Sequence, residues 1–240
     1  MIARRYGLPP AYDDRLVEML RAVGTTRGVR PEDLTGFWPR VGHEYVGRLL
    51  VVGRAVNGWI DHTTVTRLGE AGGPERFAAT IRRTADAEGA CPLSWVTEAW
   101  GRRDGYNTKK SAFWRFAREA LIRLEPEAAA DPRWSGRLAW SNLTKIAPWE
   151  RGNPPTKLLR LQREYGPRLF AHEVLTYRPE NVLVTTGRWW FEPFAAELGL
   201  DVEWRADDVG YAQANGTRYL VAPHPQGARR TTLNKVLEAL

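Results

Sequence analysis

The chain has 240 residues, of which 43% are hydrophobic and 26% are charged, as in an ordinary single globular domain. Its formal net charge of +7 makes a polyanion such as nucleic acid a suitable partner. The single cysteine, Cys91, excludes an intrachain disulfide and any cysteine-based zinc or iron–sulfur site. No apolar run reaches the ~20 residues that cross a bilayer, and the N-terminus lacks the apolar core of a signal peptide. We therefore expect a cytoplasmic protein with no membrane partner.

The first half of the chain alternates between helices, whose apolar residues recur at intervals of three and four, and short buried strands. In chain order the predicted elements are a helix over 13–23, a strand over 48–52, a helix over 74–85, a helix over 111–124 and a strand over 137–141. Ser111 is the expected cap of the 111–124 helix. We expect residues 1–45 to form a helical extension of one domain that spans residues 1–240.

The second half continues the alternation. It predicts a helix over 156–177 in two pieces that are interrupted at Gly166–Pro167, a strand over 181–186 and a helix over about 189–198. Strands over 201–204 and 217–221 and a helix over 229–240 follow. Alternating strands and helices indicate an α/β fold in which helices cover both faces of the sheet.

Four loops follow predicted strands, and in such sheets ligands bind beyond the carboxyl ends of the strands. The loops are GRAVNGW (53–59), SNLTKIAPW (141–149), TGRWW (186–190) and APHPQG (222–227). We expect them to form one site. The first has the glycine spacing of a phosphate-binding loop, but Trp59 and Ile60 occupy its Lys and hydroxyl positions, which excludes nucleotide hydrolysis by that mechanism.

Three residues in these loops suggest recognition of a flat polar ligand. His224 lies between two prolines, so its imidazole can donate a hydrogen bond from a fixed direction to a developing oxyanion; the alternative is a histidine packed on a turn. The carboxamide of Asn142 can read the edge of an amide-like base, or it caps the following loop. Trp59 offers a ring on which such a base can stack.

The order and spacing of GRAVNG (53–58), SNLTK (141–145), VLVTTG (182–187) and HPQG (224–227) resemble the uracil-DNA glycosylase superfamily. That family has a GQDPY or GxNPG motif after its first strand, an Asn that ends a middle strand and reads uracil, and a late HPSP loop whose His holds O2 of the base. The resemblance implies a three-layer α/β/α fold around a short, mostly parallel sheet. It also implies a pocket for a base flipped out of DNA, with no metal or cofactor.

The resemblance assigns roles within the first loop, and one position departs from the family. Gly53 and Ala55 would line the base pocket, but Ala55 stands where the family has its catalytic Asp or Asn. An alanine cannot position or activate water. Asn57 and Asp61 are the replacements that we consider, together with His62. His224 would then stabilise the departing base anion.

The same resemblance predicts a DNA-binding surface. Its basic residues are Lys109, Lys110, Lys145, Arg229 and Arg230. The three lysines also fit ordinary solvated charges. Ala228, Arg229 and Arg230 replace the family's apolar wedge, which fills the gap left by a flipped base. Glu173 is assigned to a solvated face of the 156–177 helix.

Three functions remain open from the sequence. The first is a DNA N-glycosylase, a base-excision repair hydrolase that removes uracil or a related damaged or deaminated base. The second is a nucleic-acid- or nucleobase-binding protein that has kept the pocket and lost catalysis. The third is a small-molecule hydrolase that reuses the pocket. Ala55 separates the first from the second.

Overall fold

Four adjacent parallel strands form the centre of the molecule. The computed structural model describes residues 6–56, 62–86, 91–150 and 152–240. The parallel strands are β3 (Leu49–Gly53), β5 (Leu138–Asn142), β7 (Asn181–Val184) and β10 (Thr217–Val221). They belong to a seven-stranded sheet in the order β2-β5-β3-β7-β10-β9-β8. The outer strands β2 (Arg40–Val41), β9 (Gly210–Ala214) and β8 (Glu203–Trp204) are antiparallel to their neighbours.

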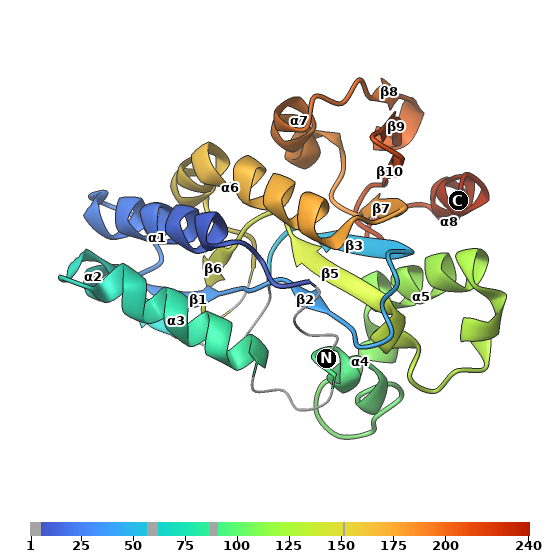
Figure 1. Ribbon diagram of the computed structural model, residues 1–240, viewed down its shortest axis with the longest axis horizontal. Coiled ribbons are helices and arrows are strands. Elements are labelled where there is room, and N and C mark those ends of the chain that lie inside the picture. The colour runs from blue at the N-terminus through green and yellow to red at the C-terminus, as the bar shows by residue number, and fades with distance from the viewer. Residues whose placement is uncertain (1–5, 57–61, 87–90, 151) are drawn as a thin grey trace.

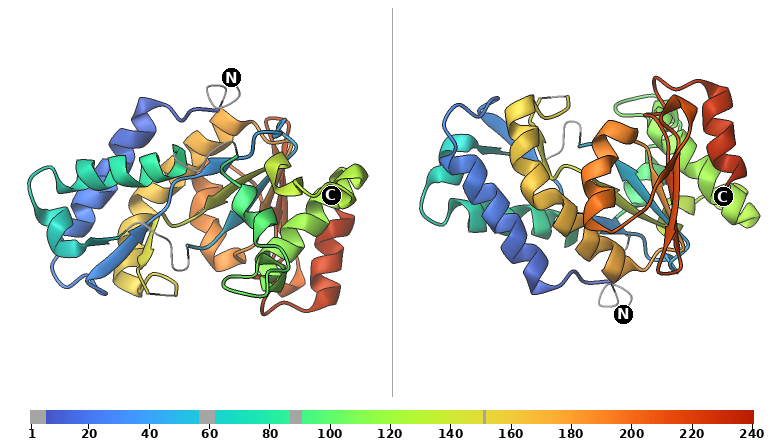
Figure 2. Two further views of the ribbon diagram at one scale, coloured as in Figure 1. Left: turned by 90° about the horizontal axis from the view of Figure 1, so that it is seen from below. Right: turned by 90° about the horizontal axis from the view of Figure 1, so that it is seen from above.

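Helices cover both faces of this sheet, so the chain is a mixed α/β protein. The helices α6 (Thr156–Tyr177) and α7 (Arg188–Glu197) lie on one face, and α5 (Ala112–Leu124) and α8 (Arg230–Glu238) lie on the other, together with the short α4 (Ser94–Glu98) (Figure 2). Side chains alternate between the two cores because successive strand residues point to opposite faces. Leu50 and Val52 pack with α6 and α7, whereas Leu49 and Val51 pack with α5 and α8. All five residues of β3 are buried, as expected for a strand covered on both sides.

A second, three-stranded antiparallel sheet lies beside the first three helices (Figure 1). Its strands are β1 (Asp33–Gly36), β4 (Thr63–Thr64) and β6 (Ile146–Pro148), and the helices are α1 (Pro10–Thr25), α2 (Val65–Gly69) and α3 (Gly73–Asp86). Together they enclose a third core cluster that includes Leu16, Leu34 and Phe77. The 1–45 segment therefore differs from the expected helical extension, because it also supplies β1 and β2.

The helix α6 corrects one prediction. It runs for 22 residues without a break, although Pro167 lies inside it. Pro167 lacks a backbone N–H, and this is why a break was expected. Burial holds the helix together instead, since Leu159 and Phe170, on either side of the proline, both belong to the core that α6 shares with the sheet. Gly166 is also buried, beside the carbonyl of Leu143 and the ring of Phe194.

The other predicted helices and the four central strands are confirmed to within a few residues. Ser111 caps α5, and its hydroxyl accepts a hydrogen bond from the N–H of Trp114 at 3.4 Å. Strand β9 and the small sheet were not predicted. Short 3-10 helices complete the chain at Thr108–Lys110, Pro126–Ala129, Trp134–Arg137 and Ala206–Asp208.

Candidate functional site at the carboxyl edge of the sheet

The carboxyl ends of the four parallel strands are adjacent, as predicted. Gly53 pairs in register with Asn142, and Val184 pairs with both Val52 and Val221. The backbone continues these contacts into the loops, where the N–H groups of Leu143 and Gly187 donate to the carbonyls of Gly53 and Ala222. The four loops therefore leave one edge of the sheet and form a single candidate site.

An open hollow of about 420 Å³ lies between the first loop and the fourth loop. Its lining consists of Arg54, Pro223, His224, Gln226 and Gly227. Arg54 and His224 are the charged or titratable groups of this lining. The hollow thus brings a cation and an imidazole together at the edge where the sequence predicts the ligand.

Arg54 joins three of the four loops, although it was not among the predicted site residues. Its Nε and Nη2 donate to the carbonyl of Thr186 at 3.2 and 3.0 Å, and its own carbonyl accepts from the N–H and hydroxyl of Thr144 at 2.9 and 2.8 Å. Its guanidinium lies 5.5 Å from the ring centroid of Trp190. Burial lowers the pKa of Arg54. No carboxylate among the described residues pairs with it, so in the described part of the hollow its positive charge has no counter-charge.

His224 is held in an orientation that defines which nitrogen can donate. Its Nδ1 accepts a hydrogen bond from the backbone N–H of Gln226 at 3.3 Å. A neutral imidazole that accepts at Nδ1 carries its proton on Nε2. Burial, and secondly the positive charge of Arg54, lower the pKa of His224. At neutral pH the ring is therefore an uncharged donor through Nε2.

Asn142 provides a second polar group, and its side chain lies against Gly53. The side chain is 2% exposed, and its Nδ2 has no hydrogen-bond partner in the described part of the chain. Leaving such a buried donor unpaired costs about 1–3 kcal/mol. Asn142 does not belong to the lining of the hollow. It lies at the end of β5, next to the strand from which Arg54 leaves.

Gly53 gives the Asn142 side chain its space. A Cβ at position 53 would lie 2.4 Å from Oδ1 of Asn142. We expect Gly53→Ala to destabilise the protein by about 1–3 kcal/mol, because the amide must move within a packed site. The same change in an Asn142→Ala background is expected to cost little, since the clash is then gone. Urea denaturation of the two single variants and the double variant measures this coupling, and strictly additive losses would contradict it.

The first loop supplies no catalytic acid at its described positions. Ala55 is half-buried and packs against the core beneath α5, so its methyl group cannot activate water. Asn57, Trp59 and Asp61, which were predicted as water-positioning or stacking residues, lie outside the described residues. His62 follows them, and its Nε2 lies 2.8 Å from Oδ1 of Asp33.

Lys145 and Glu173 correct two predictions. Lys145 was expected to contact DNA phosphate and Glu173 to face solvent, but both side chains are completely buried. Nζ of Lys145 lies 2.7 Å from Oε1 of Glu173 and also donates to the hydroxyl of Ser141 at 3.0 Å and to the carbonyl of Asn142 at 2.5 Å. Ser141 and Tyr12 both donate to Glu173. Mutual pairing and these hydrogen bonds are what permit both charges to leave water.

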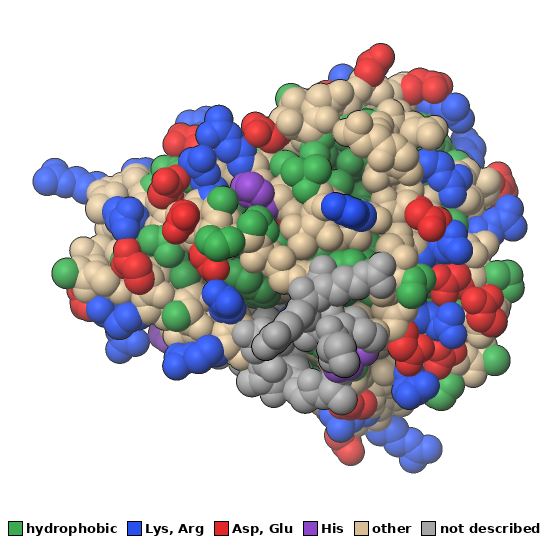
Figure 3. Space-filling model, in the orientation of Figure 1, with side chains coloured by type: hydrophobic (Ala, Val, Ile, Leu, Met, Phe, Trp, Pro, Cys, Tyr) green, Lys and Arg blue, Asp and Glu red, His purple; other side chains and the backbone are tan. Residues whose placement is uncertain are grey.

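The remaining basic residues of the predicted DNA surface do not line the hollow. Lys109, Lys110 and Arg229 are exposed, and Arg230 pairs with Glu119 at 2.8 Å. On the face of the molecule seen in Figure 3, Lys and Arg side chains alternate with Asp and Glu around the rim. That face shows no single basic patch.

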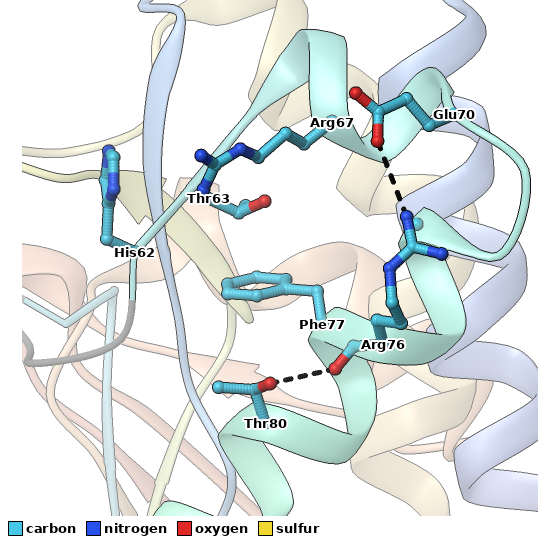
Figure 4. A pocket seen from close by; sticks show the side chains of 8 residues that line it. His62, Thr63, Arg67, Glu70, Arg76, Phe77 and Thr80 are labelled. Carbon is cyan, nitrogen blue, oxygen red and sulfur yellow. Dashed lines mark hydrogen bonds and ion pairs between the residues drawn. The ribbon is translucent and has the colours of Figure 1, made fainter.

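A second hollow of about 290 Å³ lies outside the four loops, beside α2 and α3 (Figure 4). The ring of Phe77 forms part of its lining, and Arg76 pairs with Glu70 at 3.4 Å. Arg67 and His62 also line it. The described residues contain no cluster of His, Cys, Asp and Glu that could hold a metal ion, in this hollow or elsewhere.

No protein-family model matches this chain, and no curated protein matches its sequence. Among the described residues, no helix is both long and apolar enough to cross a membrane.

Proposed function

We propose that this chain is a DNA glycosylase-like protein that takes a flipped-out deaminated or damaged base, such as uracil, into the carboxyl-edge site. The unpaired buried Nδ2 of Asn142 carries the proposal. A ligand carbonyl that accepts from this amide would recover the free energy lost by its burial. A base edge offers such a carbonyl beside ring nitrogens, which Oδ1 of Asn142 can read.

The hollow supplies the second part of the chemistry. When the N-glycosidic bond breaks, the electron pair of that bond leaves with the base, and negative charge develops on the ring and its carbonyl oxygens. The Nε2–H of His224 can donate to such an oxygen, and the positive charge of Arg54 lowers the energy of the anion. The parallel four-stranded core with helices on both faces also supports the resemblance to the uracil-DNA glycosylase superfamily.

Hydrolysis also needs a group that places water at the sugar carbon. Ala55 cannot do this, so excision depends on Asn57 or Asp61. The packing of Ala55 against the core favours a second candidate function, in which the protein binds the base without cleaving the bond. Both functions use Asn142 and His224 for recognition, and they differ in the release of free base.

Oligonucleotide cleavage distinguishes the two. Single- and double-stranded DNA carrying uracil, hypoxanthine, xanthine or a thymine mismatch is incubated with the protein and then treated with alkali, which cleaves at abasic sites. Cleavage of one of these substrates supports the glycosylase. Salt-sensitive binding of a modified strand without cleavage supports the binding protein, and neither cleavage nor binding would contradict both.

The protonation state of His224 leads to a prediction about its titration. Its pKa is lowered in the folded protein, whereas an unperturbed histidine titrates at about 6.5. Between these two pKa values the unfolded chain binds more protons than the folded chain. The contribution of neutral His224 to the free energy of unfolding is therefore complete above the unfolded pKa and is lost as the pH falls through the folded pKa. We expect the NMR titration midpoint of His224, assigned with His224→Asn, to fall below about 6.5. A midpoint at or above that value would contradict the neutral donor.

A further inference from the structure

We propose that Arg163 and Trp189 form a stacking subsite for the unpaired base next to the one in the hollow, on the same strand; this rests on the proposed function. Trp189 lies in the first turn of α7, and its side chain is 57% exposed. An exposed indole ring offers a flat face on which a nucleobase can stack. Among the described residues, Trp189 is the tryptophan whose side chain is mostly exposed.

The guanidinium of Arg163 lies over this ring and adds a positive charge to the surface. Its guanidinium carbon lies 4.1 Å from the ring centroid of Trp189, and its Nη2 donates to the Trp189 carbonyl at 3.2 Å. No carboxylate among the described residues pairs with Arg163, so its charge remains available to a polyanion. Indole and guanidinium planes both stack on bases of any sequence.

A chain of side-chain contacts connects the subsite to the lining of the hollow. The rings of Trp189 and Trp190 are 5.4 Å apart and nearly perpendicular, and Arg54 lies over the ring of Trp190. Ring and guanidinium contacts thus run from the lining of the hollow to the Arg163–Trp189 surface. The short segment between β7 and α7, directly before both tryptophans, supplies the Thr186 carbonyl to which Arg54 donates. A strand whose base enters the hollow would therefore meet this surface with a neighbouring nucleotide.

The proposed occupant is a single strand. In a duplex the face of the neighbouring base is covered by stacking on the next pair, whereas an unpaired base offers its face to an aromatic ring. The net charge of +7 and the unpaired Arg54 and Arg163 suit the phosphates that connect the two nucleotides.

Two single-stranded oligonucleotides with one central uracil test the inference on the full chain. In one, thymine nucleotides flank the uracil; in the other, the flanking positions are abasic spacers with the same phosphates. We expect Trp189→Ala to weaken binding of the first roughly 5- to 150-fold, as base–aromatic stacking predicts, and to leave binding of the second unchanged. Trp189→Phe is expected to retain much of the affinity.

Matched controls separate stacking from charge and folding. Arg163→Ala is expected to weaken binding of the thymine-flanked strand, whereas Arg168→Ala removes an exposed arginine from the same helix and is expected to have no effect. If Trp189→Ala binds both strands as tightly as the wild type does, the inference is overturned and the proposed function still stands. Binding of neither strand would overturn both. A dimer that Trp189→Ala dissociates, with unchanged binding of the oligonucleotides, would assign the surface to a second copy of this chain and overturn the inference.

Discussion

Replacing Lys145 by methionine is expected to destabilise the protein by about 3–5 kcal/mol. The change removes the ammonium group and leaves the carboxylate of Glu173 fully buried without a counter-charge. Glu173 then keeps only the hydroxyl donors of Tyr12 and Ser141. These do not offset the desolvation of a full charge.

The loss should be large because the pair connects three elements. Tyr12 belongs to α1, Ser141 to β5 and Glu173 to α6, and Lys145 also holds the carbonyl of Asn142. Burial lowers the pKa of Lys145, and the charge of Glu173 opposes that shift. The pair therefore fixes the end of β5, from which the Asn142 side chain projects.

Urea denaturation measures the effect. The double variant Lys145→Met/Glu173→Gln removes both charges and keeps hydrogen-bonding groups, so we expect it to be more stable than Lys145→Met alone. Arg82→Ala breaks the exposed pair with Asp13 and is the matched control, with an expected loss of about 1 kcal/mol or less. A Lys145→Met variant as stable as Arg82→Ala would show that the buried pair does not hold the site together.

If the protein excises bases, His224→Ala is expected to lower the rate of excision about 10²- to 10³-fold. The reason is that the Nε2–H donor acts on charge that develops only as the bond breaks. Binding of the intact strand should change much less, since the base carbonyl is neutral before cleavage. Single-turnover excision and equilibrium binding, measured on the same substrate, separate the two effects.

His172→Ala is the matched control for this experiment. His172 is a partly exposed histidine of α6 that does not line the hollow, so its loss should leave the rate near that of the wild type. Equal rates for the wild type and His224→Ala, in folded protein, would place the chemistry elsewhere.

The central strands could be predicted because their information is local. Residues 49–52 and 181–184 are continuous apolar or β-branched runs, apart from Asn181, and such runs are typical of strands buried on both faces. The small sheet could not be predicted, because β1, β4 and β6 have at most four residues each and are defined by pairing with distant segments. The break expected at Pro167 was wrong because tertiary packing outweighs the local cost of proline.

The candidate site was likewise predictable only in part. His224 and Asn142 could be identified, because each follows a strand whose end is visible in the sequence. The burial of Lys145 could not, since its partner Glu173 lies 28 residues further along the chain, on a helix whose register the sequence left open. Arg54 was missed because its partners, Thr186 and Trp190, come from another loop. Ala55 was identified in the sequence as a departure from the family. Because its methyl group packs against the core, the group that positions water in a glycosylase would have to be Asn57 or Asp61.

The central claim is that a base binds at the carboxyl edge of the sheet, between Asn142 and the hollow. NMR of the labelled protein with a single-stranded oligonucleotide that carries uracil, hypoxanthine or xanthine tests it most directly. We predict that one of these strands shifts the side-chain amide signals of Asn142 and the imidazole signals of His224, while an otherwise identical strand with an abasic site at that position does not. Shifts confined to the second hollow, around Arg67 and Phe77, or equal shifts with the abasic strand, would contradict the claim.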